Sequence, residues 1–279
     1  VTATDTASGT ITDLNGAITI TGDDVTEGQV LSYSLSLALT SGELAPGTVI
    51  EVPLNWGSLT DTADASDVSG SLPLTATLTV DASGTAATGS VDLTTLTADG
   101  LEGQEALTLS IADGVASVGG VTAEGITGDS AEGTITDTTT VTITPKDLGS
   151  GVSGGEAYED PSLGEHQLTF SVSLSEVNST GAPVTVYFTI DEGADNTDLN
   201  LSGLSAGRTA GEYSIQIPDG QQTVDLVLPV ADDAVVELVA ETVTVNLNGT
   251  DNANVTATDT ASGTITDLNG AITITGDDV

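Results

Sequence analysis

The sequence contains no cysteine and no methionine, and only two of its 279 residues are basic, Lys146 and Arg208. Without cysteine the chain can form neither a disulfide nor a thiolate zinc site, and a single histidine, His166, argues further against zinc or copper. Without a basic surface the chain cannot neutralise phosphates, so we expect no nucleic acid partner. An anionic membrane surface would repel it, and no apolar run is long enough to cross a bilayer, so we expect no membrane insertion.

Aromatic residues make up only 3% of the chain, whereas acidic residues number 42 and give a formal net charge of −40. The hydrophobic content of 38% is enough for a core, which must be built from Val, Leu, Ile and Ala. So many carboxylates repel one another in a compact chain. Composition leaves two explanations open: divalent cations neutralise part of the charge, or the acids form a solvated face suited to high salt.

The first 25 residues, VTATDTASGTITDLNGAITITGDDV, recur without change at residues 255–279. A repeat without drift is typical of a tandem array. The motif Gly-Thr-Ile-Thr-Asp occurs a third time at residues 133–137, which divides the chain into two modules. We expect the first module at residues 14–140 and the second, diverged module at residues 141–267.

The two ends of the chain then have a simple interpretation. We expect residues 1–13 to be the last strand of a preceding module copy and residues 268–279 to be the first strand of a following copy. The sequence would thus be an internal piece of a longer chain with a two-module period. The alternative is an artificial copy of one end, which leaves the two modules intact.

Apolar residues alternate with Thr, Ser and charged residues through both modules, as in residues 31–39, 50–56, 168–174 and 184–190. A period of two predicts β-strands with one buried and one solvated face. Each module contains about seven such stretches, separated by turn residues, and no helical stripe. We therefore predict an all-β fold of two tandem seven-stranded antiparallel β-sandwiches, arranged end to end.

The acidic residues cluster at the ends of the predicted strands. Loops from alternate strand ends meet at one pole of a sandwich, so we expect their carboxylates to converge. Oxygen ligands in flexible loops favour Ca²⁺, although the chain has no EF-hand loop. Plain solvated acidic loops are the alternative. The candidate calcium ligands are Asp13, Asp23, Asp24, Glu27, Asp64, Asp67, Asp99, Glu102, Glu105, Asp137, Glu159, Asp195, Asp198, Asp232, Asp233, Glu237, Glu241 and Asp267.

The acidic segments of the first module follow a definite order. Val25-Thr26-Glu27-Gly28 precedes an alternating strand, VIEVPLNW precedes a loop with Asp64 and Asp67, and residues 99–107 lead into a late strand before the closing GTITD. This order resembles that of a Calx-beta domain. The second module is similar more loosely, through Glu159, the central loop 191–198 and the late segment 232–241.

The resemblance implies a seven-stranded sandwich that holds Ca²⁺ in acidic loops at one pole, near the junction with the next module. Long arrays of such modules are similar to the extender regions of very large bacterial repeats-in-toxin adhesins, which lack cysteine, are strongly acidic and are exported by a type I system. The resemblance therefore implies an extracellular, cell-surface location, in a Gram-negative bacterium. The implied function is a calcium-rigidified spacer whose partners are neighbouring modules of the same polypeptide.

Other functions remain as alternatives. The chain could be a structural subunit of a surface layer, sheath or fibre that assembles with like chains by strand exchange. Trp56 and Tyr213 could serve a glycan-binding module, although core packing also explains them. We do not expect an enzyme, because His166 stands alone and acidic pairs are uninformative in so acidic a chain.

Overall fold

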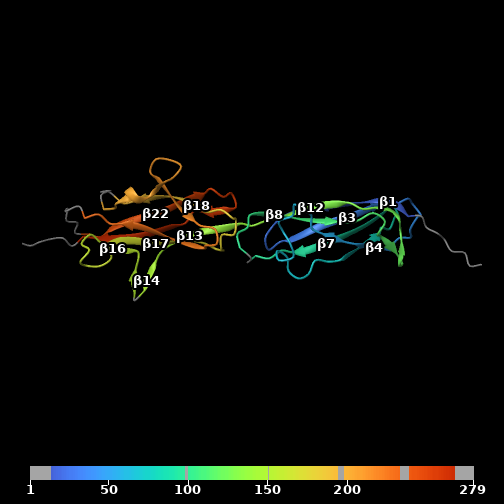
Figure 1. Ribbon diagram of the computed structural model, residues 1–279, viewed down its shortest axis with the longest axis horizontal. Coiled ribbons are helices and arrows are strands. Elements are labelled where there is room, and N and C mark those ends of the chain that lie inside the picture. The colour runs from blue at the N-terminus through green and yellow to red at the C-terminus, as the bar shows by residue number, and fades with distance from the viewer. Residues whose placement is uncertain (1–13, 98–99, 150, 194–197, 233–238, 268–279) are drawn as a thin grey trace, which may run out of the picture. The chain divides into compact units, whose positions relative to one another are not determined.

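Strands account for nearly all of the regular structure in the computed structural model, which describes residues 14–97, 100–149, 151–193, 198–232 and 239–267 (Figure 1). The chain divides into two units: unit 1 contains residues up to Asp99 together with Gln104–Asp137, and unit 2 contains Gly100–Gly103 and Thr138 onward. The division thus falls after Asp137, whereas the sequence analysis places it after Thr140.

Unit 1 is built from two sheets. The larger has the order β10 (Val121–Thr122), β9 (Ser117–Val118), β4 (Val49–Pro53), β6 (Thr75–Val80), β7 (Ala86–Thr94), β3 (Val30–Ala38), β1 (Asn15–Gly22) and β11 (Gly125–Thr127). The smaller has the order β2 (Asp24–Thr26), β12 (Ser130–Thr136), β8 (Gln104–Ser110) and β5 (Asn55–Trp56).

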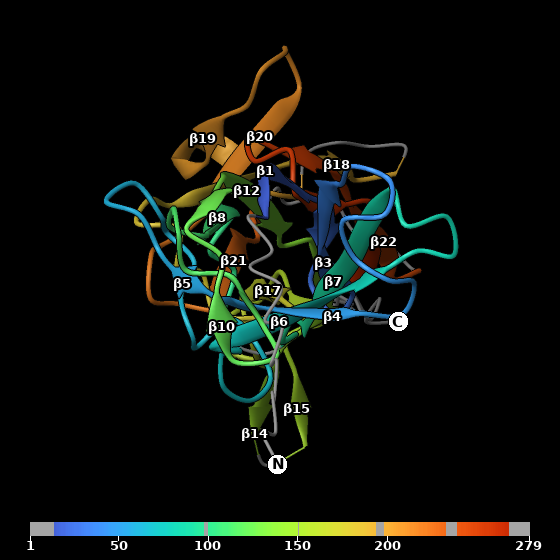
Figure 2. The ribbon, with the colours of Figure 1, turned by 90° about the vertical axis from the view of Figure 1, so that its right-hand side faces the viewer.

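Unit 2 is also built from two sheets. One has the order β21 (Thr223–Pro229), β17 (Gln167–Leu174), β13 (Thr139–Pro145) and β23 (Val255–Ala257). The other has the order β16 (Glu156–Tyr158), β24 (Thr260–Thr266), β22 (Glu241–Thr250), β18 (Val184–Asp191), β20 (Glu212–Ile217) and β19 (Ser205–Ala206). A ribbon of β14 (Asp147–Gly149) and β15 (Val152–Ser153) projects from this unit (Figure 1 and Figure 2).

The predicted alternation is the actual basis of both cores. Along β3, Leu31, Tyr33, Leu35 and Leu37 are buried, and the residues between them are exposed or half-buried. Along β17 the corresponding positions, at Leu168–Leu174, are buried as well. Side chains of one sheet therefore pack against the other in each unit, and the prediction of an all-β fold of two sandwiches is confirmed. Among the described residues the helical structure is a single 3₁₀ turn at Leu201–Gly203, and no helix could cross a membrane.

Trp56 and Tyr213 are half-buried and pack against the cores of unit 1 and unit 2, respectively. The Trp56 ring packs edge-on against Tyr33 with 5.4 Å between ring centroids, and Trp56 Nε1 donates a hydrogen bond to the Pro73 carbonyl at 2.6 Å. Tyr213 lies against Phe188, with 5.9 Å between their ring centroids. This packing explains Trp56 and Tyr213 without a sugar ligand.

Short parallel pairs are the main departure from the predicted antiparallel sheets. β1 pairs with β11 and β2 with β12 in unit 1, and β13 pairs with β23 and β16 with β24 in unit 2. In unit 1 the first long strand, β1, is followed directly by the short strand β2, and in unit 2 the strand β13 is followed, after the β14–β15 ribbon, by β16. Both short strands join the opposite sheet. This switch brings the end of the short strand beside the end of the last strand.

Unit 2 also contains four residues from an earlier part of the chain. Leu101 has an exposed fraction of 0% and belongs to the core of unit 2. Its N–H donates to the Val177 carbonyl at 2.8 Å, and its carbonyl accepts from the N–H of Ser179 at 2.9 Å. The core of the second module is therefore completed by a residue that lies outside 141–267.

Candidate cation sites

One pole of unit 1 collects acidic residues because three strands end or begin there. Thr26 of β2 lies beside Thr136 of β12, and the N–H of Glu27 donates to the Thr136 carbonyl at 3.2 Å. Asp137 follows directly, with an exposed fraction of 2%. Glu105, near the start of β8, is paired in register with Ile135 and is 9% exposed. The Gly-Thr-Ile-Thr-Asp motif thus delivers Asp137 to a largely buried place among other carboxylates.

Two carboxylates at this pole are close enough to share a cation. Oxygen atoms of Asp67 and Glu105 lie within 4.8 Å of each other, and both residues are buried. Glu102, which belongs to unit 2, is exposed. At that separation two unit charges repel by about 3.5 kcal/mol at an effective dielectric constant of about 20. A bound cation would remove this repulsion.

The loop that carries Asp67 is fixed by hydrogen bonds. The Asp67 carboxylate accepts a hydrogen bond from the N–H of Asp64, and the Asp67 carbonyl accepts one from the N–H of Leu96 at 2.9 Å. Nearby, Asp61 accepts from the N–H of Thr108 at 2.7 Å and from Ser58. Burial alone would raise the pKa of Asp61, but the hydrogen bonds from Ser58 and Thr108 hold it below its ordinary value. The ionised Asp61 carboxylate therefore links this loop to Thr108 of β8.

Unit 2 repeats the same arrangement with different residues. Tyr158 of β16 lies beside Thr266 of β24, and the N–H of Glu159 donates to the Thr266 carbonyl at 3.3 Å, matching the bond of Glu27 in unit 1. Glu159 is 1% exposed and Asp267 is 5% exposed. Glu241, at the start of β22, is paired with Ile265 and is half-buried. The register therefore places these three acidic residues at one pole.

Asp198 and Glu192 add two further buried carboxylates to unit 2. Their exposed fractions are 1% and 9%, and neither Asp198 Oδ2 nor Glu192 Oε2 has a hydrogen-bond partner among the described residues. Burial raises the pKa of Glu192, as does the charge of Asp198, against the effect of a hydrogen bond from the N–H of Leu199. Glu192 was not among the ligands predicted from the sequence. Its only signal there is its position two residues after the alternating stretch 184–190.

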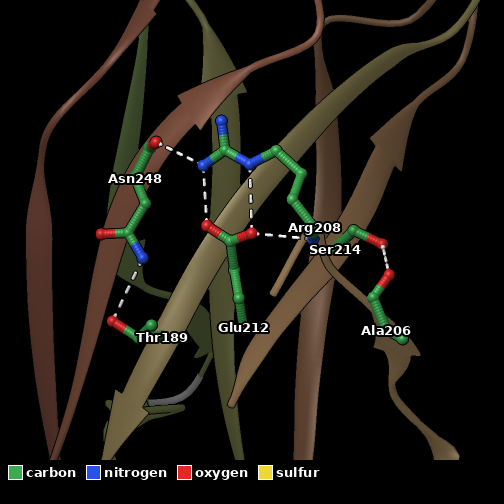
Figure 3. Close-up of polar contacts among 6 residues, drawn as sticks. All are labelled: Thr189, Ala206, Arg208, Glu212, Ser214 and Asn248. Atoms are coloured by element: carbon green, nitrogen blue, oxygen red, sulfur yellow. Dashed lines mark hydrogen bonds and ion pairs between the residues drawn. The ribbon is translucent and has the colours of Figure 1, made fainter. Parts of the chain in front are cut away.

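The basic residues Lys146 and Arg208 are each paired with an acidic residue. Lys146 pairs with Asp225. Arg208 binds Glu212 through two nitrogen atoms, Nη2 at 2.7 Å and Nε at 3.1 Å (Figure 3). Neither side chain is therefore available to neutralise the buried carboxylates. The single histidine, His166, places its Nδ1 2.9 Å from the carbonyl oxygen of Tyr158, the residue before Glu159.

Arg208 makes two further contacts besides its ion pair with Glu212. Its Nη2 also donates to the Asn248 carbonyl at 2.9 Å, as Figure 3 shows, and its guanidinium lies 4.1 Å from the centre of the Tyr187 ring. The hydrogen bonds from Arg208 hold the pKa of Glu212 below its ordinary value, and Glu212 in turn raises the pKa of Arg208.

The remaining predicted ligands are exposed or lie outside the described residues. Asp23, Asp24, Asp64 and Asp232 are exposed. Asp24 accepts a hydrogen bond from Thr134 Oγ1 at 2.6 Å. Asp64 accepts bonds from Ser66, which lower its pKa. The predicted ligands outside the described residues are Asp13, Asp99, Asp195, Asp233 and Glu237.

The donor set fits a hard divalent cation. The side chains that the strand ends bring together at the two poles are carboxylates, and buried carboxylates are costly unless a positive charge is near. Carboxylate oxygens on loops of adaptable geometry suit Ca²⁺ better than metals that prefer nitrogen or sulfur. Glu27, Asp67, Glu105 and Asp137 in unit 1 are matched in unit 2 by Glu159, Asp198, Glu241 and Asp267.

No family model and no curated protein matches this sequence. Among solved structures, the apo form of the Calx CBD1 domain is 17% identical, with a TM-score of 0.29, and the match covers 46% of this chain and 96% of that one. CBD12 from CALX1.2 is 13% identical (TM-score 0.30; 85% and 81% covered). The adhesin InvE of Yersinia pseudotuberculosis is 14% identical (TM-score 0.27; 89% and 58% covered).

Proposed function

We propose that this protein is a calcium-binding spacer whose two β-sandwich units are stabilised by Ca²⁺ at their acidic poles. One observation carries the proposal: both units bury carboxylates at matching strand ends, while Lys146 and Arg208 are paired with Asp225 and Glu212. A buried cluster of like charges is unfavourable unless a cation binds it. Because the same arrangement of buried carboxylates occurs in both units, chance is a poor explanation for it.

The stabilisation follows from mass action. A cation that binds the folded unit and not the unfolded chain favours folding by an amount that depends on its concentration relative to the dissociation constant. Extracellular calcium sites have dissociation constants on the order of 10⁻⁴ to 10⁻³ M. A site filled at ten times its dissociation constant contributes about 1.4 kcal/mol. In low calcium the same charges would disfavour the compact state.

We infer an extracellular location at the surface of a Gram-negative bacterium, within a long repetitive adhesin. The supporting features are the undrifted repeat, the lack of cysteine, the net charge of −40 and the resemblance of the acidic segments to Calx-beta modules. In this role the protein is not an enzyme, and its partners are neighbouring modules of the same polypeptide. Calcium would also stiffen the short links between modules.

Calorimetric titration of the full chain with Ca²⁺ tests the proposal, with Mg²⁺ at equal ionic strength as the control. We expect saturable Ca²⁺ binding at submillimolar to millimolar concentration and weaker Mg²⁺ binding, because Mg²⁺ demands a stricter octahedral geometry. Small-angle scattering in the same solutions would report whether the particle extends. Equal and unsaturable heats for both ions would mean that the acidic residues form only a solvated coat.

A second candidate function is assembly with like chains into a surface layer, sheath or fibre. Residues 255–267 form β23 and β24, and residues 14–25 form β1 and most of β2. Identical copies of these sequences stand at residues 1–13 and 268–279, outside the described residues. Such copies could occupy the same strand positions in a neighbouring chain. Concentration-dependent filaments in sedimentation experiments would favour this function, and a monomer at high concentration would count against it.

A further inference from the structure

Glu192 and Asp198 are held together by the backbone of unit 2. Glu192 follows the last residue of β18, and its carboxylate accepts a hydrogen bond from the N–H of Leu199, the residue next to Asp198. Leu199 forms a bridge with Val230, and the Asp198 carbonyl accepts from the N–H of Ala231 at 2.8 Å. Both carboxylates therefore occupy positions fixed by β18 on one side and by the end of β21 on the other.

The two side chains present unsatisfied oxygen atoms to the same region. Asp198 Oδ2 and Glu192 Oε2 are both buried and lack hydrogen-bond partners within the described part of the chain. The N–H of Leu199, the residue directly after Asp198, donates to the Glu192 carboxylate, so the backbone brings the two residues together. Two buried negative charges with free oxygen atoms are the arrangement that a cation satisfies and that a protein otherwise avoids.

Unit 1 has no carboxylate at the position of Glu192. Trp56 of β5 is paired with Leu109 four residues after Glu105, and Ile190 of β18 is paired with Val245 four residues after Glu241. The residue that matches Glu192 is therefore Ser58, which is exposed and donates a hydrogen bond to Asp61 at 2.6 Å. The two units consequently differ in the negative charge available to a cation.

We propose that Glu192 and Asp198 form a calcium site particular to unit 2, in which Glu192 is a ligand without a counterpart in unit 1. The proposal rests on calcium binding as the function of the acidic poles and adds a specific ligand to it. The affinity of a calcium site with oxygen ligands rises with the number of charged ligands. The charge of Glu192 therefore increases the calcium affinity of the site in unit 2.

Hydrogen exchange of the full chain, followed by mass spectrometry across a Ca²⁺ titration, tests the proposal separately in each unit. The informative variant is Glu192→Gln, which keeps the shape of the side chain and removes its charge. The matched control is Glu156→Gln, an exposed glutamate on β16 of the same unit. We expect Glu192→Gln to raise the calcium midpoint for protection of unit 2 peptides by tenfold or more, on the order set by losing one charged ligand.

Unit 1 peptides serve as an internal reference and should keep the wild-type midpoint in both variants. Asp198→Asn should shift the unit 2 midpoint in the same direction as Glu192→Gln. Protection in chelator shows whether each variant is folded before calcium is added. A Glu192→Gln chain with the wild-type midpoint would overturn the proposal, and would indicate that a proton rather than a cation occupies the pair. A wild-type chain that ignores calcium in both units would instead overturn calcium binding itself.

Discussion

At the scale of single residues, burial separates the acidic groups that could hold a cation from those that are merely solvated. Asp67 and Glu105 are buried close to each other, whereas Asp64 and Asp24 are exposed and bonded to local hydroxyl groups. Only the first kind has a strong electrostatic reason to bind a cation.

Removing the charge of Glu105 should therefore weaken the calcium response of unit 1. We expect Glu105→Gln to raise the calcium concentration needed to stabilise this unit on the order of tenfold, because one charged ligand is lost. The fluorescence of Trp56, the single tryptophan of the chain, reports unfolding of unit 1 directly. The control is Glu51→Gln on β4, an exposed site that should leave the response unchanged. An equal response in both variants would count against Glu105 as a ligand.

The pairing of Glu212 with Arg208 predicts a dependence on acid. The folded-state pKa of Glu212 lies below its ordinary value of 4.5, chiefly through the hydrogen bonds from Arg208. Its stabilising contribution is thus complete above the unfolded-state pKa and is lost as the pH falls through the lowered folded-state pKa. In chelator, the difference in unfolding free energy between the wild type and Glu212→Gln should shrink between about pH 6 and pH 3. A difference that stays constant over this range would contradict the pairing.

Residue roles were only partly predictable from the sequence. Asp137 and Asp267 stand out there because a repeated motif ends on each of them. Glu192 does not stand out, because the feature that distinguishes it is burial near Asp198, which depends on the bridge between Leu199 and Val230 just after β21. A linear pattern of acidic residues carries no information about which of them face inward.

At the scale of strands, one aspartate in each unit fixes the first long strand. Asp129 Oδ2 accepts a hydrogen bond from the N–H of Ile20 in β1 at 2.9 Å. Asp259 Oδ2 accepts one from the N–H of Ile143 in β13 at 3.0 Å. Both aspartates stand four residues before the glycine of the Gly-Thr-Ile-Thr-Asp motif, so the contact repeats with the sequence.

Replacing either aspartate by alanine leaves a strand N–H without its partner. We expect Asp129→Ala to lower the free energy of unfolding of unit 1 by about 1–3 kcal/mol, and Asp259→Ala to do the same in unit 2. The loss should be equal in calcium and in chelator, because these residues lie outside the cation clusters. Denaturant unfolding followed by hydrogen exchange of each unit measures both effects. A loss seen only in calcium would assign these residues to the cation sites instead.

The glycine of the repeated motif is required by packing. A Cβ atom on Gly133 would lie 2.8 Å from Leu31 Cδ1 and 2.9 Å from the hydroxyl oxygen of Tyr33. Both neighbours belong to the buried face of β3, so neither can move freely. Gly133→Ala should therefore lower the stability of unit 1 by about 1–3 kcal/mol through overpacking. Thermal unfolding of unit 1, followed by Trp56 fluorescence, measures this loss. An unchanged melting temperature would show that the core accommodates the added methyl group.

The long strands were predictable and the short ones were not. Alternation over seven to nine residues, as in β3 and β12, identifies a strand from its sequence alone. The parallel strands β2, β11, β16 and β23 span three residues each, which is too few to show a period. The strands β2 and β16 bring Glu27 and Glu159 to the cation clusters. Their parallel pairing could not be predicted from the sequence and is seen only in the structure.

At the scale of the whole molecule, charge and folding are linked. The chain carries a net charge of −40 with two basic side chains, and each basic side chain is already paired with an acid. Repulsion of this size opposes compaction unless cations reduce it. The sequence predicted this conflict from composition, but the choice between diffuse screening and specific sites required the buried carboxylates at matching strand ends.

Thermal unfolding of the full chain in chelator and in millimolar Ca²⁺ tests the central claim most directly. A NaCl solution of equal ionic strength controls for screening of surface charges. We expect Ca²⁺ to raise the melting temperature by several degrees or more, since each site filled at ten times its dissociation constant contributes about 1.4 kcal/mol, and NaCl to raise it far less. Coincident melting curves in calcium and in NaCl would contradict specific calcium binding at the two poles.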